Sequence, residues 1–310
     1  MPHPILYRFL TVMLSAGALG FDRPAHAEPL AISHSYIAFG AATEIISEKG
    51  EVVWKYPAAT RDGYSLPNGN LLLTLSKNKE YTGGAVIEVT RDREIVFIYR
   101  GTQAEVNTAQ ALANGNIVLT EAGANPRLLE IDRAGQIVVE FPLRCQTTNP
   151  HLQSRMARKL ANGNYLVPLL LDRVVREYTP AGQIVWEFKT PDDPKECWPF
   201  TAIRIPNGHT VVTLTHGNTI VEVDAAGKIV WQCSNADLPA TFNDPCGAQW
   251  LPNGNIVVTS YAAKGDAIKL FEINRAKKIV WSRRDGKPHG VHEFQILSTN
   301  GNLLDGAVFR

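Results

Sequence analysis

Short, mostly apolar runs recur along most of the chain, and many of them are bounded by a glycine, asparagine or aspartate. The runs Leu128–Asp132 and Ile220–Asp224 are typical, because they are short, rich in aliphatic side chains and followed by a glycine-containing turn. This pattern predicts strands. No stretch sustains an apolar period of 3.6 residues, so we expect almost no helix. The chain therefore belongs to the all-β class.

One turn motif recurs between the apolar runs. It reads Leu-Pro-Asn-Gly-Asn at 66–70 and returns, with small changes, at 112–116, 160–164, 205–209, 251–255 and 300–302. Its central glycines are 46, 48, 45, 46 and 47 residues apart. Asn-Gly favours a type I′ hairpin, in which both central residues need positive φ. A hairpin repeated at this period is typical of a propeller blade of four strands.

Each repeat divides into four predicted strands. Strand a follows the Asn-Gly turn, strand b is of the Ile-Glu-Val type, strand c carries an Ile-Val-Trp motif, and strand d leads to the next turn. Four tryptophans share the same strand-c position and are expected to dock one blade onto the next: Trp54, Trp186, Trp231 and Trp281.

Strand counting predicts how the ring closes. Strands b, c and d occur six times, whereas strand a occurs up to seven times if 35–39 and 303–309 both count. A spare strand allows the two chain ends to share one blade, which removes an exposed edge. We predict that 28–310 is a single six-bladed β-propeller of four-stranded blades, with seven blades as the alternative count.

Residues 1–27 have the pattern of a secretory signal peptide. Arg8 precedes an apolar run at 9–19, and Ala25-His26-Ala27 provides a small-x-small cleavage site. A buried N-terminal helix is the alternative. The run is too short to span a membrane, and no later stretch is long and apolar enough. We therefore expect an exported chain, periplasmic or extracellular, without membrane insertion, and a monomer.

Charge and cysteine content limit the partners further. Two of the 31 basic and one of the 30 acidic residues lie in 1–27, which leaves 29 of each. This balance gives no electrostatic reason to expect nucleic acid as a partner. The four cysteines are compatible with two disulfides, and we expect Cys233–Cys246 within one blade and Cys145–Cys197 between blades. No Cys-x-x-Cys spacing supports a zinc site.

The loops differ in length between the two ends of the predicted propeller. The b–c and d–a turns are tight and share one end, here called the turn face. The a–b and c–d loops share the other end, the long-loop face, and the c–d loops at 141–155, 188–200, 232–246 and 283–292 are long. Binding and catalytic groups usually lie on long loops held by a rigid scaffold, so we expect function on the long-loop face.

One position in strand d changes its chemistry from blade to blade. It lies five residues before the Leu or Ile of the Asn-Gly turn and is occupied by Arg61, Asn107, Arg155, Phe200, Cys246 and His292. A structural position would repeat its residue type, as the mostly small residues two positions later do. We expect these side chains, with the neighbouring Asp62, Thr108 and Glu293, to converge on a central pocket of the long-loop face.

The phrase Gly-x-Ile-Val-Trp-Glu-Phe at 182–188, together with the Leu-Pro-Asn-Gly-Asn turns, resembles PQQ-like β-propeller repeats and the bacterial arylsulfotransferase-type propellers. The resemblance covers 36–310. Segment 289–297 resembles the stretch in which the arylsulfotransferase-type propellers place a histidine five residues before the turn leucine. The resemblance implies His292 as a nucleophile or acid–base group, with Arg61 or Arg155 binding an anionic oxygen.

The sequence is compatible with two functions. The chain is either a scaffold that binds a protein, a glycan or a small molecule, or an arylsulfotransferase-like enzyme that transfers or hydrolyses an anionic ester group. Further candidate ligand contacts are Asn107, His289, Glu293, His151 and Trp198. No metal is predicted, because no set of carboxylates or amides from other blades accompanies His289, His292 and Glu293. No cofactor is expected, since PQQ-dependent dehydrogenases resemble the chain but generally have eight blades and, in many members, an adjacent cysteine pair.

Overall fold

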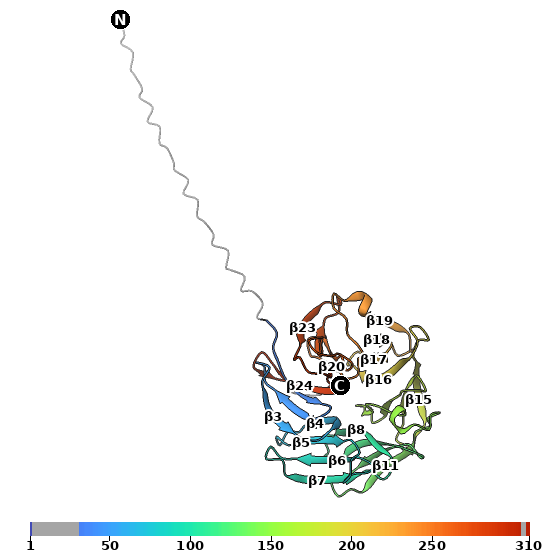
Figure 1. Ribbon diagram of the computed structural model, residues 1–310. Coiled ribbons are helices and arrows are strands. Elements are labelled where there is room, and N and C mark those ends of the chain that lie inside the picture. Colours follow the sequence, from blue (N-terminus) through green and yellow to red (C-terminus); the bar gives the residue numbers. More distant parts are fainter. Residues whose placement is uncertain (2–30, 305–307) are drawn as a thin grey trace. The chain divides into compact units, whose positions relative to one another are not determined.

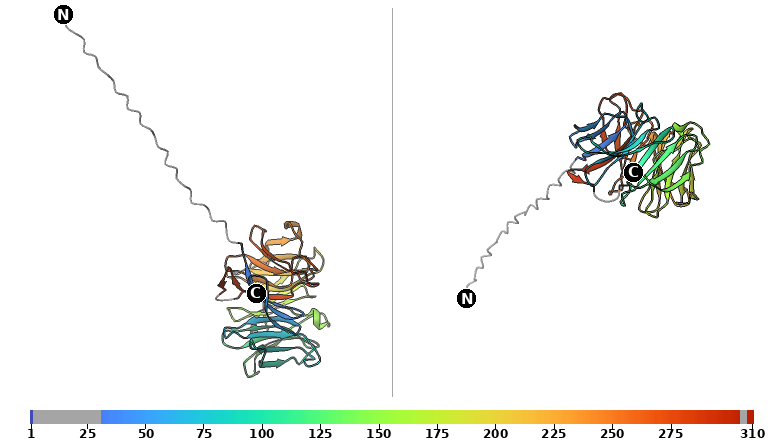
Figure 2. Two further views of the ribbon diagram at one scale, coloured as in Figure 1. Left: turned by 60° about the vertical axis from the view of Figure 1, so that its left-hand side comes forward. Right: turned by 90° about the horizontal axis from the view of Figure 1, so that it is seen from below.

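A computed structural model describes Met1, 31–304 and 308–310. Apart from Met1, the predicted signal segment lies outside the described residues. Within them, six antiparallel sheets surround a central axis, as predicted for a six-bladed propeller (Figure 1). Two further views show the sheets packed face to face (Figure 2). No helix in the described part of the chain is long and apolar enough to cross a membrane.

Each blade has its innermost strand at the axis and its outermost strand at the rim. Blade I contains β24 (Glu293–Thr299), β1 (His34–Phe39), β2 (Thr43–Ile46) and β3 (Val52–Tyr56), with the two-residue β25 (Asn302–Leu303) beside β24. Blade II contains β4 (Thr60–Ser65), β5 (Leu71–Leu75), β6 (Ala85–Val89) and β7 (Ile95–Arg100). Blade III contains β8 (Glu105–Ala111), β9 (Ile117–Ala122), β10 (Arg127–Ile131) and β11 (Ile137–Pro142).

The other three blades repeat this order. Blade IV contains β12 (Arg158–Lys159), β13 (Tyr165–Leu169), β14 (Val174–Tyr178) and β15 (Ile184–Lys189). Blade V contains β16 (Cys197–Arg204), β17 (Thr210–His216), β18 (Thr219–Val223) and β19 (Ile229–Ser234). Blade VI contains β20 (Ala248–Trp250), β21 (Ile256–Thr259), β22 (Leu270–Ile273) and β23 (Ile279–Arg283). Two short 3-10 turns, η1 (Pro150–Leu152) and η2 (Asn235–Asp237), lie in the long loops.

The two ends of the described propeller share blade I, as strand counting predicted. β24 pairs with β1 in antiparallel register from His34 and Thr299 to Phe39 and Glu293, so the ring closes without a free edge at this point (Figure 1). The spare strand differs from the prediction. Of 303–309, only Leu303 lies in a named strand, Phe309 forms an isolated bridge to Trp250, and 305–307 lie outside the described residues.

The predicted type I′ geometry is wrong for five of the six Asn-Gly turns. In the first, Gly69 has φ of 86° while Asn68 keeps a negative φ, and Leu66 and Asn70 close a three-residue loop. This is a type I turn followed by a left-handed glycine. Proline favours the observed geometry where it precedes the asparagine, because its fixed negative φ suits the first central position of a type I turn. Only the sixth turn has positive φ at both Asn300 and Gly301.

The strand-c tryptophans join neighbouring blades, as predicted. The indole Nε1 of Trp54 donates to Arg91 O at 2.7 Å, in the tight β6–β7 turn of the next blade. Trp186 and Trp231 make the equivalent bonds to Ala225 O and Arg275 O. Trp281 instead packs edge to face with His34 of β1, with ring centroids 4.7 Å apart. Each tryptophan therefore connects its blade to the next.

A buried glutamate in the third strand of five blades forms a second connection. Each accepts a hydrogen bond of 2.5 to 2.8 Å from the residue after its own Asn-Gly turn, in the pairs Asn70–Glu88, Asn116–Glu130, Asn164–Glu177, His209–Glu222 and Asn255–Glu272. Each also pairs with a basic residue of the next blade: Arg133, Lys159, Arg204, Arg275 and His34, respectively. The repeated polar residues therefore link the turns to the blade interfaces.

The expected disulfides are absent from the structure, in which all four cysteines are free. Cys233 packs in the core between blades V and VI, whereas Cys246 packs near the axis against Met156 and Phe200. Cys145 and Cys197 likewise belong to two different hydrophobic clusters. For Cys233 and Cys246 sequence proximity was misleading, because their loop runs from the outermost strand to the axis and its two ends lie at different radii.

Candidate functional site on the long-loop face

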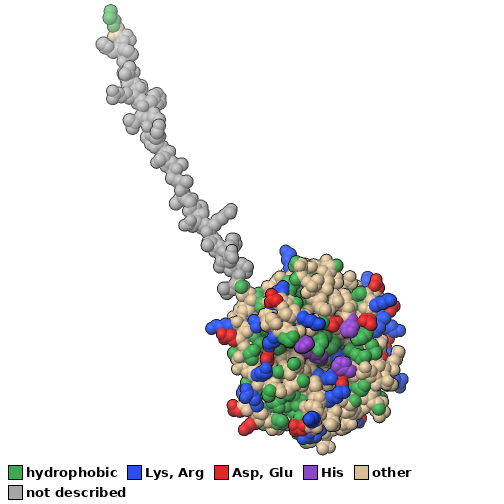
Figure 3. Space-filling model, in the orientation of Figure 1, with side chains coloured by type: hydrophobic (Ala, Val, Ile, Leu, Met, Phe, Trp, Pro, Cys, Tyr) green, Lys and Arg blue, Asp and Glu red, His purple; other side chains and the backbone are tan. Residues whose placement is uncertain are grey.

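The six side chains predicted to converge lie together around the axis, and we call them the axial ring: Arg61, Asn107, Arg155, Phe200, Cys246 and His292. Arg61 donates to Asn107 Oδ1 at 3.2 Å, and the Asn107 amide donates to Ser154 O at 3.1 Å. The Arg155 guanidinium lies 5.6 Å from the Phe200 ring, and Phe200 meets His292 edge to face. Histidine, lysine and arginine side chains gather near the middle of this face (Figure 3).

Bulges in the innermost strands position several ring residues. Thr60 pairs with Leu75 and Asp62 with Thr74, so Arg61 is the extra residue of a bulge in β4. Asn107 has the same place in β8, and Phe200 lies in a similar irregularity in β16. A bulge turns its extra side chain out of the regular alternation. Local strand irregularity therefore positions three of the six ring side chains, whereas Arg155, Cys246 and His292 lie before the first residues of their inner strands.

His292 presents one unprotonated nitrogen. Its Nδ1 lies 3.1 Å from Arg61 O, and a carbonyl can only accept, so Nδ1 carries the hydrogen. In the neutral ring, Nε2 then keeps its lone pair. Burial, followed by the charges of Arg155 and Arg61, lowers the pKa of His292 to about 3. The imidazole is therefore neutral at physiological pH, and the rings of Phe200 and Tyr261 flank it.

Arg155 is a buried cation without a carboxylate partner. Its guanidinium donates only to backbone carbonyls, those of Ser154 at 2.9 Å and His151. Its Nε has no hydrogen-bond partner among the described residues, and no carboxylate there lies within ion-pair distance. Burial and the nearby charge of Arg61 lower the pKa of Arg155 to about 9. A group this basic remains protonated at neutral pH.

Glu105 is a site residue that the sequence analysis missed. Its carboxylate pairs with Arg61 at 2.9 Å, with Lys77 at 3.3 Å and with His151 at 3.5 Å. Burial alone would raise the pKa of Glu105, but the hydrogen bond from His151 and the charge of Arg61 lower it to about 2. The signal was available, because Glu105 lies two residues before Asn107 in the same predicted strand.

The remaining predicted site residues are spread over the same face or beneath it. His151 is exposed, and its Nδ1 lies 3.5 Å from Glu105 and 3.3 Å from Arg61 Nη1. Trp198 stacks on His216 with ring centroids 4.2 Å apart, and His289 is exposed in the loop before His292. Glu293, expected to contact ligand, is fully buried below the ring. No metal-binding group of three His, Cys, Asp or Glu side chains occurs among the described residues.

Four buried side chains cross the axis beneath the ring, and we call them the axial charge cluster: Asp62, Arg158, Glu293 and Arg310. Asp62 accepts from Arg158 Nη1 and Arg310 Nη2, both at 2.9 Å, and Arg310 Nη1 donates to Glu293 at 3.2 Å. Burial raises the pKa of Glu293, with a further contribution from the charge of Asp62. The two arginines outweigh burial at Asp62 and lower its pKa. Blades I, II and IV are joined here.

The pKa of His292 gives a prediction for acid stability. Below about pH 6.5 the unfolded chain protonates this histidine, whereas the folded protein does so only near pH 3. The titration of His292 should therefore leave the free energy of unfolding unchanged above pH 6.5. Between pH 6.5 and pH 3 it should lower that free energy, by at most about 1.4 kcal/mol per pH unit for one proton. His292→Gln should flatten this slope, as measured by urea unfolding at pH 7.5, 6, 5 and 4. His289→Gln is the control, and equal slopes for wild type and His292→Gln would contradict the assignment.

No protein-family model and no curated protein sequence matches the chain. Among solved structures, a protein of unknown function from Bacteroides caccae is 24% identical, with a TM-score of 0.74 over 84% of this chain and 98% of that one. A streptogramin B lyase is 14% identical, with a TM-score of 0.59 over 84% of this chain and 87% of its own. The periplasmic gluconolactonase of Pseudomonas aeruginosa is 13% identical, with a TM-score of 0.55 over 83% and 80%. At these identities the likeness concerns the fold alone, and it supports a six-bladed β-propeller without assigning a family.

Proposed function

We propose that this chain is an exported propeller that binds a small anionic ligand at the centre of its long-loop face. The observation that carries the proposal is Arg155, a buried guanidinium paired with backbone carbonyls instead of a carboxylate. A buried charge without a counter-charge is costly, and a bound anion nearby reduces that cost. Export rests on the signal-like pattern of residues 1–27.

The neighbouring charges support an anion as the ligand. Arg61 and Arg155 contribute two guanidinium groups to the axial ring, and Glu105 is the buried carboxylate that pairs with Arg61. His292 is neutral and therefore does not repel an anion. The ligand would contact the partly exposed Arg61 and His292 directly, while Arg155 contributes its charge from below. Sulfate esters and carboxylates suit this arrangement, because guanidinium groups bind planar or tetrahedral oxyanions well.

Binding is tested by a thermal-shift titration with sulfate, phenyl sulfate, phosphate and acetate. A ligand at 100 times its dissociation constant adds about 2.7 kcal/mol of stability to the wild type. Arg155→Met should lose this shift, since the variant keeps the side-chain volume without the charge. Arg176→Met is the matched control, because Arg176 forms a peripheral ion pair with Glu187. Equal shifts in wild type and Arg155→Met would overturn the proposal, and a shift with oligosaccharides alone would replace the anion by a glycan.

A second candidate function is group transfer at the same site, and the free Nε2 of His292 favours it. In an arylsulfotransferase-like reaction, the Nε2 lone pair would attack sulfur, the sulfur–oxygen bond to the aryl group would break, and its electron pair would leave with the phenolate. A hydroxyl acceptor would then take the sulfuryl group and restore the neutral imidazole, its proton passing to solvent. Two of the similar solved structures are enzymes, although of other reaction classes.

Turnover separates the two candidates. Release of nitrophenol from nitrophenyl sulfate by wild type, and its loss in His292→Ala, would support transfer. A sulfuryl adduct on His292, detected by mass spectrometry of the intact protein, would identify the nucleophile. Ligand binding without release or adduct would leave the binding scaffold as the function.

A further inference from the structure

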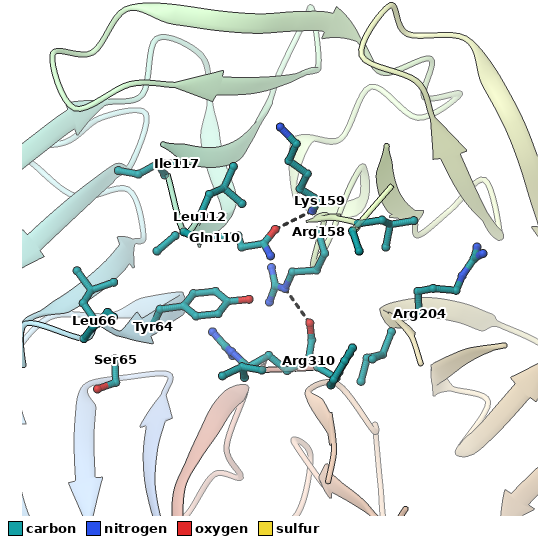
Figure 4. A pocket seen from close by; sticks show the side chains of 18 of the residues that line it. Tyr64, Ser65, Leu66, Gln110, Leu112, Ile117, Arg158, Lys159, Arg204 and Arg310 are labelled. Atoms are coloured by element: carbon teal, nitrogen blue, oxygen red, sulfur yellow. Dashed lines mark hydrogen bonds between the residues drawn. The ribbon is translucent and has the colours of Figure 1, made fainter. Parts of the chain in front are cut away.

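A cavity lies at the other end of the axis, on the turn face. It has a volume of about 1130 Å³ and opens among the Asn-Gly turns of blades II to V (Figure 4). Its size suits a drug-sized small molecule. The axial charge cluster, fully buried, separates this cavity from the axial ring. The cavity is therefore independent of the long-loop site.

The wall of the cavity is apolar because of the repeat itself. In blades II to V the residue that starts each Asn-Gly turn is aliphatic and lines the cavity: Leu66, Leu112, Leu160 and Ile205. Phe309 adds an aromatic side chain and packs edge to face on Trp250. A ring of this kind buries the apolar body of a ligand at roughly 25 cal/mol per Å² of apolar area.

The floor of the cavity contains an unused hydrogen-bond donor. Tyr64 is 6% exposed, and its hydroxyl has no partner among the described residues. Its ring lies against the guanidinium groups of Arg310 and Arg158, at 4.1 and 5.5 Å. Figure 4 shows the hydroxyl pointing into the space between Gln110, Arg158 and Arg310. A buried hydroxyl without a partner carries a desolvation cost that a ligand acceptor removes.

The charges that line the cavity are mostly positive. Five lining residues are basic and one, Glu88, is acidic: the basic set is Arg133, Arg158, Lys159, Arg204 and Arg310. The carboxylates that pair with the rim cations are almost fully buried in the blade interfaces, whereas the cations themselves are partly exposed. All five cations already pair with carboxylates, and those of Arg158 and Arg310 are Asp62 and Glu293, so a ligand meets partly exposed cations at the rim rather than a net positive charge.

We propose that the turn-face cavity binds an amphipathic anion, with its apolar body against the aliphatic ring and its carboxylate accepting a hydrogen bond from the Tyr64 hydroxyl. Burial raises the pKa of Tyr64, so the hydroxyl remains a donor at neutral pH. The Gln110 side chain is placed to donate as well, since its oxygen already accepts from Lys159 N at 2.7 Å. A free amphiphile reaches this recessed floor, whereas a lipid headgroup held in a bilayer does not.

The test compares decanoate with the uncharged decanol by calorimetric titration below the micelle concentration. Decanoate should bind more tightly, and Tyr64→Phe should raise its dissociation constant by about 10- to 100-fold, the range for one hydrogen bond to a charged group. Tyr64→Phe keeps the packed ring and removes no internal hydrogen bond, so the variant should fold normally. Tyr261→Phe, on the long-loop face, is the matched control and should bind decanoate as the wild type does.

The other outcomes overturn the proposal. Equal affinity of wild type and Tyr64→Phe would place decanoate elsewhere, and equal binding of decanol would remove the role of charge. Capture by phosphatidylglycerol vesicles without binding of free decanoate would make the surface a membrane contact. Sulfate should not compete with decanoate, because the anion site on the long-loop face is separate. A negative result with decanoate at the turn-face cavity would leave the proposed anion site on the long-loop face untouched, and a negative result with sulfate would leave the cavity proposal untouched.

Discussion

Asp62→Ala is expected to destabilise the protein by about 3 to 5 kcal/mol, because it leaves Arg158 and Arg310 buried without their shared carboxylate. Removing one partner of a buried ion pair costs far more than the pair itself contributes. For a domain of this size the melting temperature should fall by roughly 6 to 20 °C. Thermal unfolding by circular dichroism, with urea unfolding for the free energy, measures the effect.

A peripheral ion pair is the control for Asp62→Ala. Glu187 pairs with Arg176 at 2.8 Å, and both side chains are partly exposed. Glu187→Ala should therefore cost at most about 1 kcal/mol. If Asp62→Ala costs no more than Glu187→Ala, the axial charge cluster does not hold the inner strands together.

Gly63→Ala is expected to cost about 1 to 3 kcal/mol or more, although alanine occupies the equivalent position in four other blades. A Cβ on Gly63 would lie 2.5 Å from both Leu72 O and the Phe39 ring. Neither neighbour can move easily, since one is backbone in the paired strand and the other is a core side chain that is 1% exposed. Overpacking of this kind strains a closely packed core. Urea unfolding measures the loss.

A double variant shows whether Phe39 causes the strain. Phe39→Leu removes the ring edge nearest the new methyl group, so Gly63→Ala should cost less in that background. The expected coupling energy is about 0.5 to 3 kcal/mol. Additive losses would mean that the backbone contact with Leu72, and not the ring, is responsible. The glycine of blade II and the phenylalanine of blade I would then be independent features.

The buried middle of the axis differs from its two ends in how its polar groups are paired. The axial charge cluster joins its carboxylates and arginines by several internal hydrogen bonds and serves stability, although Arg310 Nε has no partner among the described residues. The axial ring above it holds an uncompensated cation, and the cavity below it holds an unpaired hydroxyl. Several other buried side-chain atoms also lack partners among the described residues, and those that face an opening are the ones where a ligand is expected. This contrast is the basis of both proposals.

Much of the architecture could be predicted from the sequence, because each repeat unit can be recognised within a short stretch of the chain. The spacing of Gly69, Gly115 and the later turn glycines determined the blade count, and the tryptophans of strand c predicted the blade contacts. The comparison of equivalent positions in strand d also selected the residues of the axial ring. Each of these inferences needs only a pattern that recurs every 45 to 48 residues.

Other features were decided by the tertiary structure. Proline before asparagine already favoured a type I turn, but the bulges at Arg61 and Asn107 depend on how each inner strand meets its neighbour. The cysteine pairing failed for a similar reason, since distance along a loop does not give distance from the axis. The sequence by itself determined a six-fold repeat of strands and turns with variable residues near the axis. Only the closed ring decided which carboxylate faces which arginine, because those contacts join blades far apart in the chain and depend on a register that no local pattern contains.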